Sequence, residues 1–281
     1  MHKILEKRQL SDNVFRMRVE APLIARERKP GQFVILMVDE NFGERIPLTI
    51  GDADDTSIVL VFQTVGATTM KLSRLEEGDS IPAILGPLGN PTSIRGLNGE
   101  KPGRVVCVGG GIGVAPMHPI AQALKAAGND VTIIMGARNK SLFVMEDEMR
   151  KIAGDKLILI TDDGSSGRKG LVTEPLKELC EAKAVDEVIA IGPPIMMKFC
   201  ALTTKPYGVK TIASLNTIMI DGTGMCGGCR VTVGGETKFV CVDGPEFDAH
   251  QVDWDQMFKR MGAFKPQEAA AKEHVCKAGI F

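Results

Sequence analysis

The sequence predicts a β barrel, then an α/β domain with a Rossmann-like parallel sheet, and then a small metal-binding segment. Three observations carry this prediction. Strand signals separated by turn residues fill 1–98, strands alternate with helical stretches over 99–210, and three cysteines gather within 211–252. We therefore expect a barrel domain, a nucleotide domain and a cluster segment with these bounds. A C-terminal tail at 253–281 follows, as a possible contact for a partner.

Strand signals recur along the first domain. Residues 14–19 alternate apolar and polar side chains, as a half-buried strand does, and 33–38 and 58–62 are further strand runs. Turn signals rich in proline and glycine lie at 29–32 and 86–91. Several short strands separated by turns are typical of a β barrel.

The second domain alternates strands with helical stretches. A short apolar run at 105–108 is typical of a buried parallel strand. It is followed by a glycine-rich turn and a helical stretch at 116–127. Further strands are expected at 131–135, 157–160 and 187–191. Strands that alternate with helices form right-handed βαβ units, so we expect one parallel sheet.

The glycine-rich turn after the first of these strands is a candidate pyrophosphate site. Glycine lets the backbone approach a phosphate closely, and the following helix N-terminus supplies oriented N–H groups. Two features depart from the G-x-G-x-x-G fingerprint: Pro116 stands in the last glycine position, and no acidic residue follows about 20 residues later. A tight structural turn is therefore the alternative. The candidate residues are Gly110, Gly111, Ile112, Gly113, Val114, Ala115 and Pro116.

More candidate residues follow the later strands. Ligands of open α/β sheets bind at the carboxyl ends of the strands, so these residues are expected to line one nucleotide cleft. Arg138 would suit a 2′-phosphate, and the residues alone therefore leave NAD and NADP open. The candidates are Gly136, Ala137, Arg138, Asp162, Asp163, Gly192, Pro193, Met196 and Met197.

Asp221, Cys226, Cys229 and Cys241 form a D-x4-C-x2-C-x11-C pattern. Plant-type [2Fe–2S] sites use C-x4-C-x2-C…C, so the spacing predicts such a cluster with a carboxylate in place of the first thiolate. Glycines between the ligands fit a loop whose backbone must come close to the sulfides. Because such a cluster moves single electrons, the sequence predicts a role in electron transfer.

Three other interpretations of these four residues remain open. Three cysteines and one aspartate could bind a structural zinc ion. Cys226 and Cys229 could form a redox-active C-x-x-C disulfide. Asp221 could instead be a turn residue, with Cys276 as the fourth ligand.

Composition argues against other classes of function. The net charge of −1 gives no sign of nucleic-acid binding, and no apolar run reaches the roughly 18 residues that span a bilayer. The N-terminal residues lack the apolar core of a signal peptide. The seven cysteines are an odd number and do not form a secreted disulfide framework. We therefore expect a protein of the reducing cytoplasm, without nucleic acid or membrane as a partner.

Residues 45–50, together with Pro30-Gly31-Gln32-Phe33 and the turn at 86–91, resemble the ferredoxin reductase superfamily. The resemblance implies a six-stranded antiparallel barrel that binds FAD. It also implies that Arg45 pairs with the FAD pyrophosphate, and that Thr49 is the catalytic residue near the reactive N5 atom of the flavin. The residues implied in FAD binding are Arg45, Pro47, Leu48, Thr49, Gln63, Thr64, Val65, Gly66, Thr68 and Thr69.

The order of barrel, nucleotide domain and cluster also resembles the electron-transfer subunits of dihydroorotate dehydrogenase. With Asp221 at the first ligand position, the chain more closely resembles a neighbouring family. This family is the small subunits of NADH-dependent reduced ferredoxin:NADP oxidoreductase, also described as sulfide dehydrogenase small subunits. This resemblance implies hydride transfer between NAD(H) and FAD, and single-electron transfer between FAD and a [2Fe–2S] cluster. The implied partner is a larger flavin- and [4Fe–4S]-containing subunit that handles NADP(H) and ferredoxin, in an electron-bifurcating heterodimer or higher hetero-oligomer. The alternatives are a dihydroorotate dehydrogenase partner or a zinc-stabilised, non-enzymatic nucleotide-binding protein.

Overall fold

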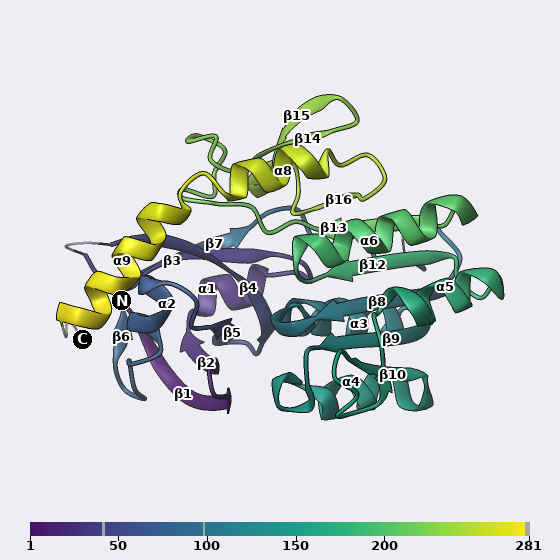
Figure 1. Ribbon diagram of the computed structural model, residues 1–281. Coiled ribbons are helices and arrows are strands. Elements are labelled where there is room, and N and C mark those ends of the chain that lie inside the picture. The colour runs from purple at the N-terminus through teal and green to yellow at the C-terminus, as the bar shows by residue number, and fades with distance from the viewer. Residues whose placement is uncertain (41–42, 98, 279–281) are drawn as a thin grey trace.

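The computed structural model describes residues 1–40, 43–97 and 99–278, with the side chains of 275–278 excepted. Within these residues two large sheets lie next to each other, and a small lobe with a two-stranded sheet lies near the edge of the second (Figure 1). No helix in the described ranges is both long and apolar enough to cross a membrane.

The first sheet is a nearly closed antiparallel barrel. Its elements are β1 (His2–Ser11), β2 (Val14–Glu20), α1 (Pro22–Glu27), β3 (Phe33–Met37), β4 (Arg45–Ala53), β5 (Ser57–Gln63), α2 (Ala67–Leu72), β6 (Ser80–Ile81) and β7 (Ala83–Leu88). Within the described residues the strand order is β6-β1-β2-β5-β4-β3-β7. The barrel prediction is confirmed, and the two-residue β6 adds a seventh strand to the six expected. Met17, Leu36 and Phe62 are almost fully buried in its core.

The second sheet is the predicted Rossmann-like sheet. Its elements are β8 (Arg104–Gly110), α3 (Val114–Ala126), β9 (Asp130–Ala137), α4 (Glu146–Ala153), β10 (Leu157–Thr161), β11 (Arg168–Lys169), α5 (Thr173–Glu181), β12 (Glu187–Ile191), α6 (Pro194–Thr204), β13 (Lys210–Ser214) and β16 (Glu246–Asp248). The order over the described residues is β11-β10-β9-β8-β12-β13-β16, all parallel except the antiparallel edge strand β16. Val105 and Cys107 pack in the core with α3, whereas Val106 and Val108 pack in the core with α5 and α6. Both faces of β8 are therefore covered, which explains its continuous apolar run.

The remaining elements form the small lobe and the C-terminus: β14 (Arg230–Val233), β15 (Glu236–Phe239), α7 (Val240–Asp243), α8 (Trp254–Met261) and α9 (Lys265–Ala278). β13 pairs with β8's neighbour β12, and β16 pairs with β13, so the nucleotide sheet extends beyond residue 210. α8 packs on β14, and α9 runs back to the barrel, where it contacts α2 (Figure 1). Over the described residues 253–278 the tail forms two helices, whereas the sequence predicts only a possible contact for a partner there.

Polar contacts join the barrel to the nucleotide domain. The Thr92 hydroxyl donates to Glu246 Oε1 at 2.7 Å, and His118 Nδ1 lies 3.4 Å from the carbonyl oxygen of Gly51. Burial raises the pKa of the Glu246 carboxyl to about 7. These contacts fix the two domains against each other, and the candidate site lies between them.

Candidate functional site

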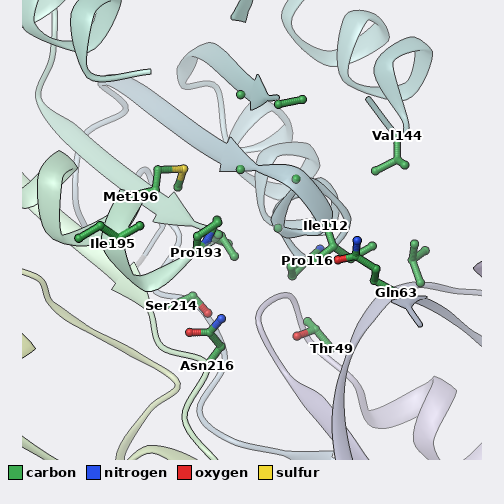
Figure 2. A pocket seen from close by; sticks show the side chains of 18 of the residues that line it. Thr49, Gln63, Ile112, Pro116, Val144, Pro193, Ile195, Met196, Ser214 and Asn216 are labelled. Carbon is green, nitrogen blue, oxygen red and sulfur yellow. The ribbon is translucent and has the colours of Figure 1, made fainter. Parts of the chain in front are cut away.

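A cavity of about 980 Å³ lies between the barrel and the nucleotide sheet (Figure 2). The barrel contributes β4 and β5, and the nucleotide sheet contributes the carboxyl ends of β8, β9, β10, β12 and β13. This is the edge at which open α/β sheets bind their ligands. The cavity brings together most of the residues predicted from the sequence, namely Pro47, Leu48, Thr49, Gln63, Val65, Thr69, Gly110, Gly111, Ile112, Gly113, Pro116, Gly136, Ala137, Arg138, Asp162, Gly192, Pro193 and Met196.

The other predicted residues lie outside the cavity lining. Arg45 is exposed at the start of β4, and the buried Thr68 hydroxyl donates to Glu44. Val114, Ala115 and Met197 are buried in the sheet–helix cores, because they lie on the faces of α3 and α6 that turn toward the sheet. Thr64, Gly66 and Asp163 are close in sequence to lining residues but are not among them.

The sequence missed several parts of the cavity lining, among them Leu171, Thr173 and Phe199. The largest missed part is the wall formed by the end of β13 and the chain that leaves it, namely Ser214, Leu215, Asn216, Thr217 and Met219. Figure 2 shows Thr49 on the barrel side, with Ser214 and Asn216 across from it on the nucleotide side. The strand-end rule would have found this wall if residues 210–214 had been assigned as a strand.

The glycine-rich turn fits a pyrophosphate. Gly111 has a φ of +54°, and a Cβ added there would meet no atom within 4 Å, so its backbone is open to a ligand. At Gly113, in contrast, an added Cβ would collide with the backbone of Ile191 at the end of β12. This glycine therefore allows the start of α3 to pack closely against the sheet. No side chain caps the 3-10 turn at Gly111–Gly113 or the start of α3. The N–H of Val114 donates back to the carbonyl of Gly111, so the N–H groups at the beginning of this turn are the ones that can face an anion.

The four predicted metal ligands lie in two pairs. Asp221 Oδ1 is 3.1 Å from Cys226 Sγ, and Cys229 Sγ is 3.3 Å from Cys241 Sγ. The second pair is buried, whereas Cys226 is exposed. In a [2Fe–2S] cluster each of the two irons takes two protein ligands, so two pairs are the arrangement that this cluster needs.

Asp221 is held as a carboxylate. A hydrogen bond from the Cys226 thiol, helped by donors from Thr223 and from the backbone of Met225 and Cys226, keeps its pKa well below the usual range. Cys241 is instead held as a protonated thiol in the absence of a metal, because burial and the neighbouring Cys229 raise the pKa of its thiol to about 12. A bound metal deprotonates a coordinating thiol outright.

The alternatives for these residues fit the geometry less well. A mononuclear zinc site needs its ligands around one point, yet within the described residues no three His, Cys, Asp or Glu side chains converge in that way. Cys226 and Cys229 each approach a different partner, and both are free thiols. The side chain of Cys276 lies outside the described residues.

Family comparisons agree with these sites. Residues 216–253 match a model of the iron–sulfur cluster binding domain of dihydroorotate dehydrogenase B. Residues 107–201 match a model of the oxidoreductase NAD-binding domain.

Whole-chain relatives give the family. The sequence is 46% identical, over 99% of this chain and 96% of the relative, to a dihydroorotate dehydrogenase B (NAD(+)) electron transfer subunit homolog of Thermotoga maritima. The chain belongs to this family. Another member, the dihydroorotate dehydrogenase B electron transfer subunit of Clostridium acetobutylicum, is 34% identical over 88% of this chain and 94% of its own.

Solved structures extend the comparison. A chain from a structure of NADH-dependent reduced ferredoxin-NADP oxidoreductase, described for flavin-based electron bifurcation, is 45% identical with a TM-score of 0.91, covering 99% of this chain and 98% of that one. Phthalate dioxygenase reductase, at 14% identity and a TM-score of 0.60 over 83% of this chain and 86% of its own, shares the fold alone.

These findings confirm the predicted resemblance to the ferredoxin reductase superfamily and its fold class. This electron transfer subunit is an oxidoreductase component whose cofactors are FAD, a [2Fe–2S] cluster and NAD(H). Its relatives are subunits of larger complexes.

Proposed function

We propose that this chain is the NAD(H)-oxidising subunit of an electron-bifurcating NADH-dependent reduced ferredoxin:NADP oxidoreductase. One observation carries the proposal: the wall that closes the cavity opposite Thr49 continues directly into the cluster loop. Thr217 and Met219 line the cavity, and the first cluster ligand, Asp221, follows two residues later. A hydride acceptor in the cavity and a one-electron carrier in the loop would thus be joined by a few residues.

Each wall of the cavity has a separate task in this proposal. Gly111 and the start of α3 hold the dinucleotide pyrophosphate, while Asp162 and Met196 border the rest of the nucleotide. Arg45 and the segment 63–69 bind the phosphate end of FAD, with Arg45 reorienting from the start of β4. Bound FAD supplies a site that accepts a hydride and releases single electrons. Thr49 lines the cavity, and its hydroxyl would hydrogen-bond the flavin N5.

We expect Thr49→Val to slow anaerobic flavin reduction by NADH about fivefold or more, since the loss of one hydrogen bond at the reacting atom costs roughly 1–3 kcal/mol. Stopped-flow absorbance would measure the rate, and FAD content should stay at the wild-type level. Thr49→Ser keeps the hydroxyl and should restore most of the rate. A wild-type chain that binds FAD but is not reduced by NADH would contradict the proposed function.

The partner that we propose is a larger flavin- and [4Fe–4S]-containing subunit that handles NADP(H) and ferredoxin, in a cytoplasmic heterodimer. Exposed apolar side chains lie on the same loop as the exposed Cys226: Met225 is 88% exposed. Ile220, beside Gly228, and Val242, beside Gly224, are 48% and 41% exposed. An apolar surface beside a redox group fits a protein that receives its electrons. The chain is 45% identical to the bifurcating oxidoreductase chain and 46% identical to the dihydroorotate dehydrogenase electron transfer subunit homolog, so identity alone does not choose between the partners. Asp221 at the first ligand position supports the bifurcating partner.

We expect Met225→Glu to weaken assembly with this subunit at least tenfold, because a charge would be buried at the centre of the apolar surface. Co-expression followed by sedimentation or native mass spectrometry would measure it. Leu23→Glu, which adds the same charge to an exposed leucine on α1, is the matched control and should assemble normally. Assembly with a subunit that oxidises dihydroorotate would select the second candidate function instead.

A further inference from the structure

The match to the iron–sulfur cluster binding domain ends at residue 253, just before α8 begins. α8 nevertheless packs in the small lobe that carries the predicted cluster ligands. The backbone N–H of Thr232 donates to Gln256 Oε1 at 2.9 Å, and the N–H of Asp253 donates to the Thr232 carbonyl at 2.8 Å. Met257 is fully buried. The helix is therefore fixed against the hairpin that follows Cys229.

From this helix, Arg260 reaches the ligand loop. Its Nη2 donates to the carbonyl oxygen of Gly228 at 3.1 Å, and that carbonyl belongs to the peptide immediately before Cys229. The N–H of Gly228 in turn donates to Cys226 Sγ at 3.4 Å. One side chain thus restrains the short link between a ligand of the first pair and a ligand of the second.

A second feature places Arg260 at the junction with the large cavity. Thr217, Gly228 and Arg260 are among the residues that line a cavity of about 10 Å³, roughly the volume that admits one water. Thr217 Oγ1 and Arg260 Nε are both buried and have no hydrogen-bond partner among the described residues. A single water could bond both atoms. Thr217 also lines the large cavity, so Arg260 lies where the cluster loop meets the wall of the flavin site.

The position of the Arg260 charge matters for the reduction potential of the cluster, because the ligands are negatively charged. Three thiolates and one carboxylate surround the two irons, and reduction adds a further negative charge. Charge near the cluster and hydrogen bonds around it set its reduction potential. A fixed guanidinium stabilises the reduced state more than the oxidised state, because an arginine cannot be deprotonated in a protein.

We propose that Arg260 is a positioning residue for the iron–sulfur cluster: it fixes the loop between Cys226 and Cys229, and its charge raises the reduction potential. This inference rests on the cluster site and function proposed above. It gives α8 a part in electron transfer rather than in packing alone.

The test compares midpoint potentials of the cluster in the full chain loaded with FAD and iron. Arg260→Gln keeps a hydrogen-bond donor but loses the charge, and it should make the one-electron equilibrium constant for cluster reduction about tenfold less favourable, which is about 59 mV. Lys259→Gln removes a charge from the adjacent exposed position of the same helix and should leave the potential unchanged. Arg260→Lys keeps the charge and should have a midpoint potential close to that of the wild type. Redox titration followed by electron paramagnetic resonance gives the potentials, and iron per chain gives occupancy.

An Arg260→Gln cluster with the wild-type potential would overturn the inference. So would an equal shift in Lys259→Gln, since the effect would then not depend on position. If Arg260→Gln loses its iron, the rate of iron loss to a chelator from Arg260→Lys decides. A rate near that of the wild type supports the positioning role, because lysine keeps a donor and the charge, and loss as fast as from Arg260→Gln overturns it. A wild-type chain that binds no iron would instead sink the cluster site itself.

Discussion

Asp221→Ala is expected to purify with FAD but to lose its iron at least tenfold faster than the wild-type chain. The carboxylate lies 3.1 Å from Cys226 Sγ and is held in place by Thr223 and by backbone donors of Met225 and Cys226. Removing it leaves one iron with a single protein ligand and leaves these donors without their acceptor. Mutation of a residue that only hydrogen-bonds to a metal ligand typically lowers metal affinity 10–100-fold. Loss of a ligand itself should lower it at least as much. Iron and sulfide analysis with visible absorption would measure it.

Two companion variants sharpen this result. Asp221→Cys restores the four-thiolate pattern and should hold the cluster with a changed potential, because ligand hardness changes. Glu236→Ala removes an exposed carboxylate from the hairpin of the same lobe and should keep full iron. Full iron retention in Asp221→Ala would show that the carboxylate is not a ligand, and Cys276→Ser would then test the alternative.

The nucleotide domain was readable from the sequence because its strands are buried on both faces. The run at 105–108 lies inside β8, and the runs at 131–135, 157–160 and 187–191 all lie within β9, β10 and β12. A central parallel strand needs apolar side chains on both sides, so its signal is continuous and local. Boundaries differ by one or two residues, as hydrogen bonding continues past the last apolar side chain.

The barrel was less readable at its margins. β1 is largely polar and half exposed, and it pairs through contacts such as the ion pair between Arg16 and Glu6 that depend on the partner strand. The sequence also treats 86–91 as a turn, whereas Gly86 and Pro87 lie inside β7. β7 is the last strand of the sheet order and has a register shift against β3, and an edge or bulged strand tolerates proline.

Some residues of the candidate site could likewise be predicted from local sequence patterns, whereas others depend on tertiary packing. The glycine-rich turn and the residues after β9, β10 and β12 obey a local rule, so most of them reach the cavity. The wall from Ser214 to Met219 depends on the addition of β13 and β16 to the sheet, which is a tertiary event. The contact between Arg260 and the cluster loop joins residues 32 positions apart and leaves no pattern in the sequence.

Gly113→Ala is expected to destabilise the nucleotide domain by about 3 kcal/mol or more, at the upper end of what overpacking a close-packed site costs. Its φ of −61° allows any residue, so backbone strain is not the reason. An added Cβ would lie against the backbone carbonyl of Ile191 and 2.8 Å from the Cα of Gly192, and neither atom belongs to a flexible side chain. α3 must then move away from β12, which would also displace the N–H groups of the glycine-rich turn that we propose for the pyrophosphate.

Urea unfolding and NADH affinity, measured together, would separate these two consequences. Gly262→Ala is the matched control, because its φ of −82° is equally ordinary and the added Cβ would meet only carbonyl oxygens at 3.5 Å and 3.7 Å. It should leave the unfolding midpoint unchanged or raise it slightly. If Gly113→Ala were as stable as this control and bound NADH normally, the helix would not need its close approach to the sheet. The glycine run would then be a tight turn with no part in holding the dinucleotide.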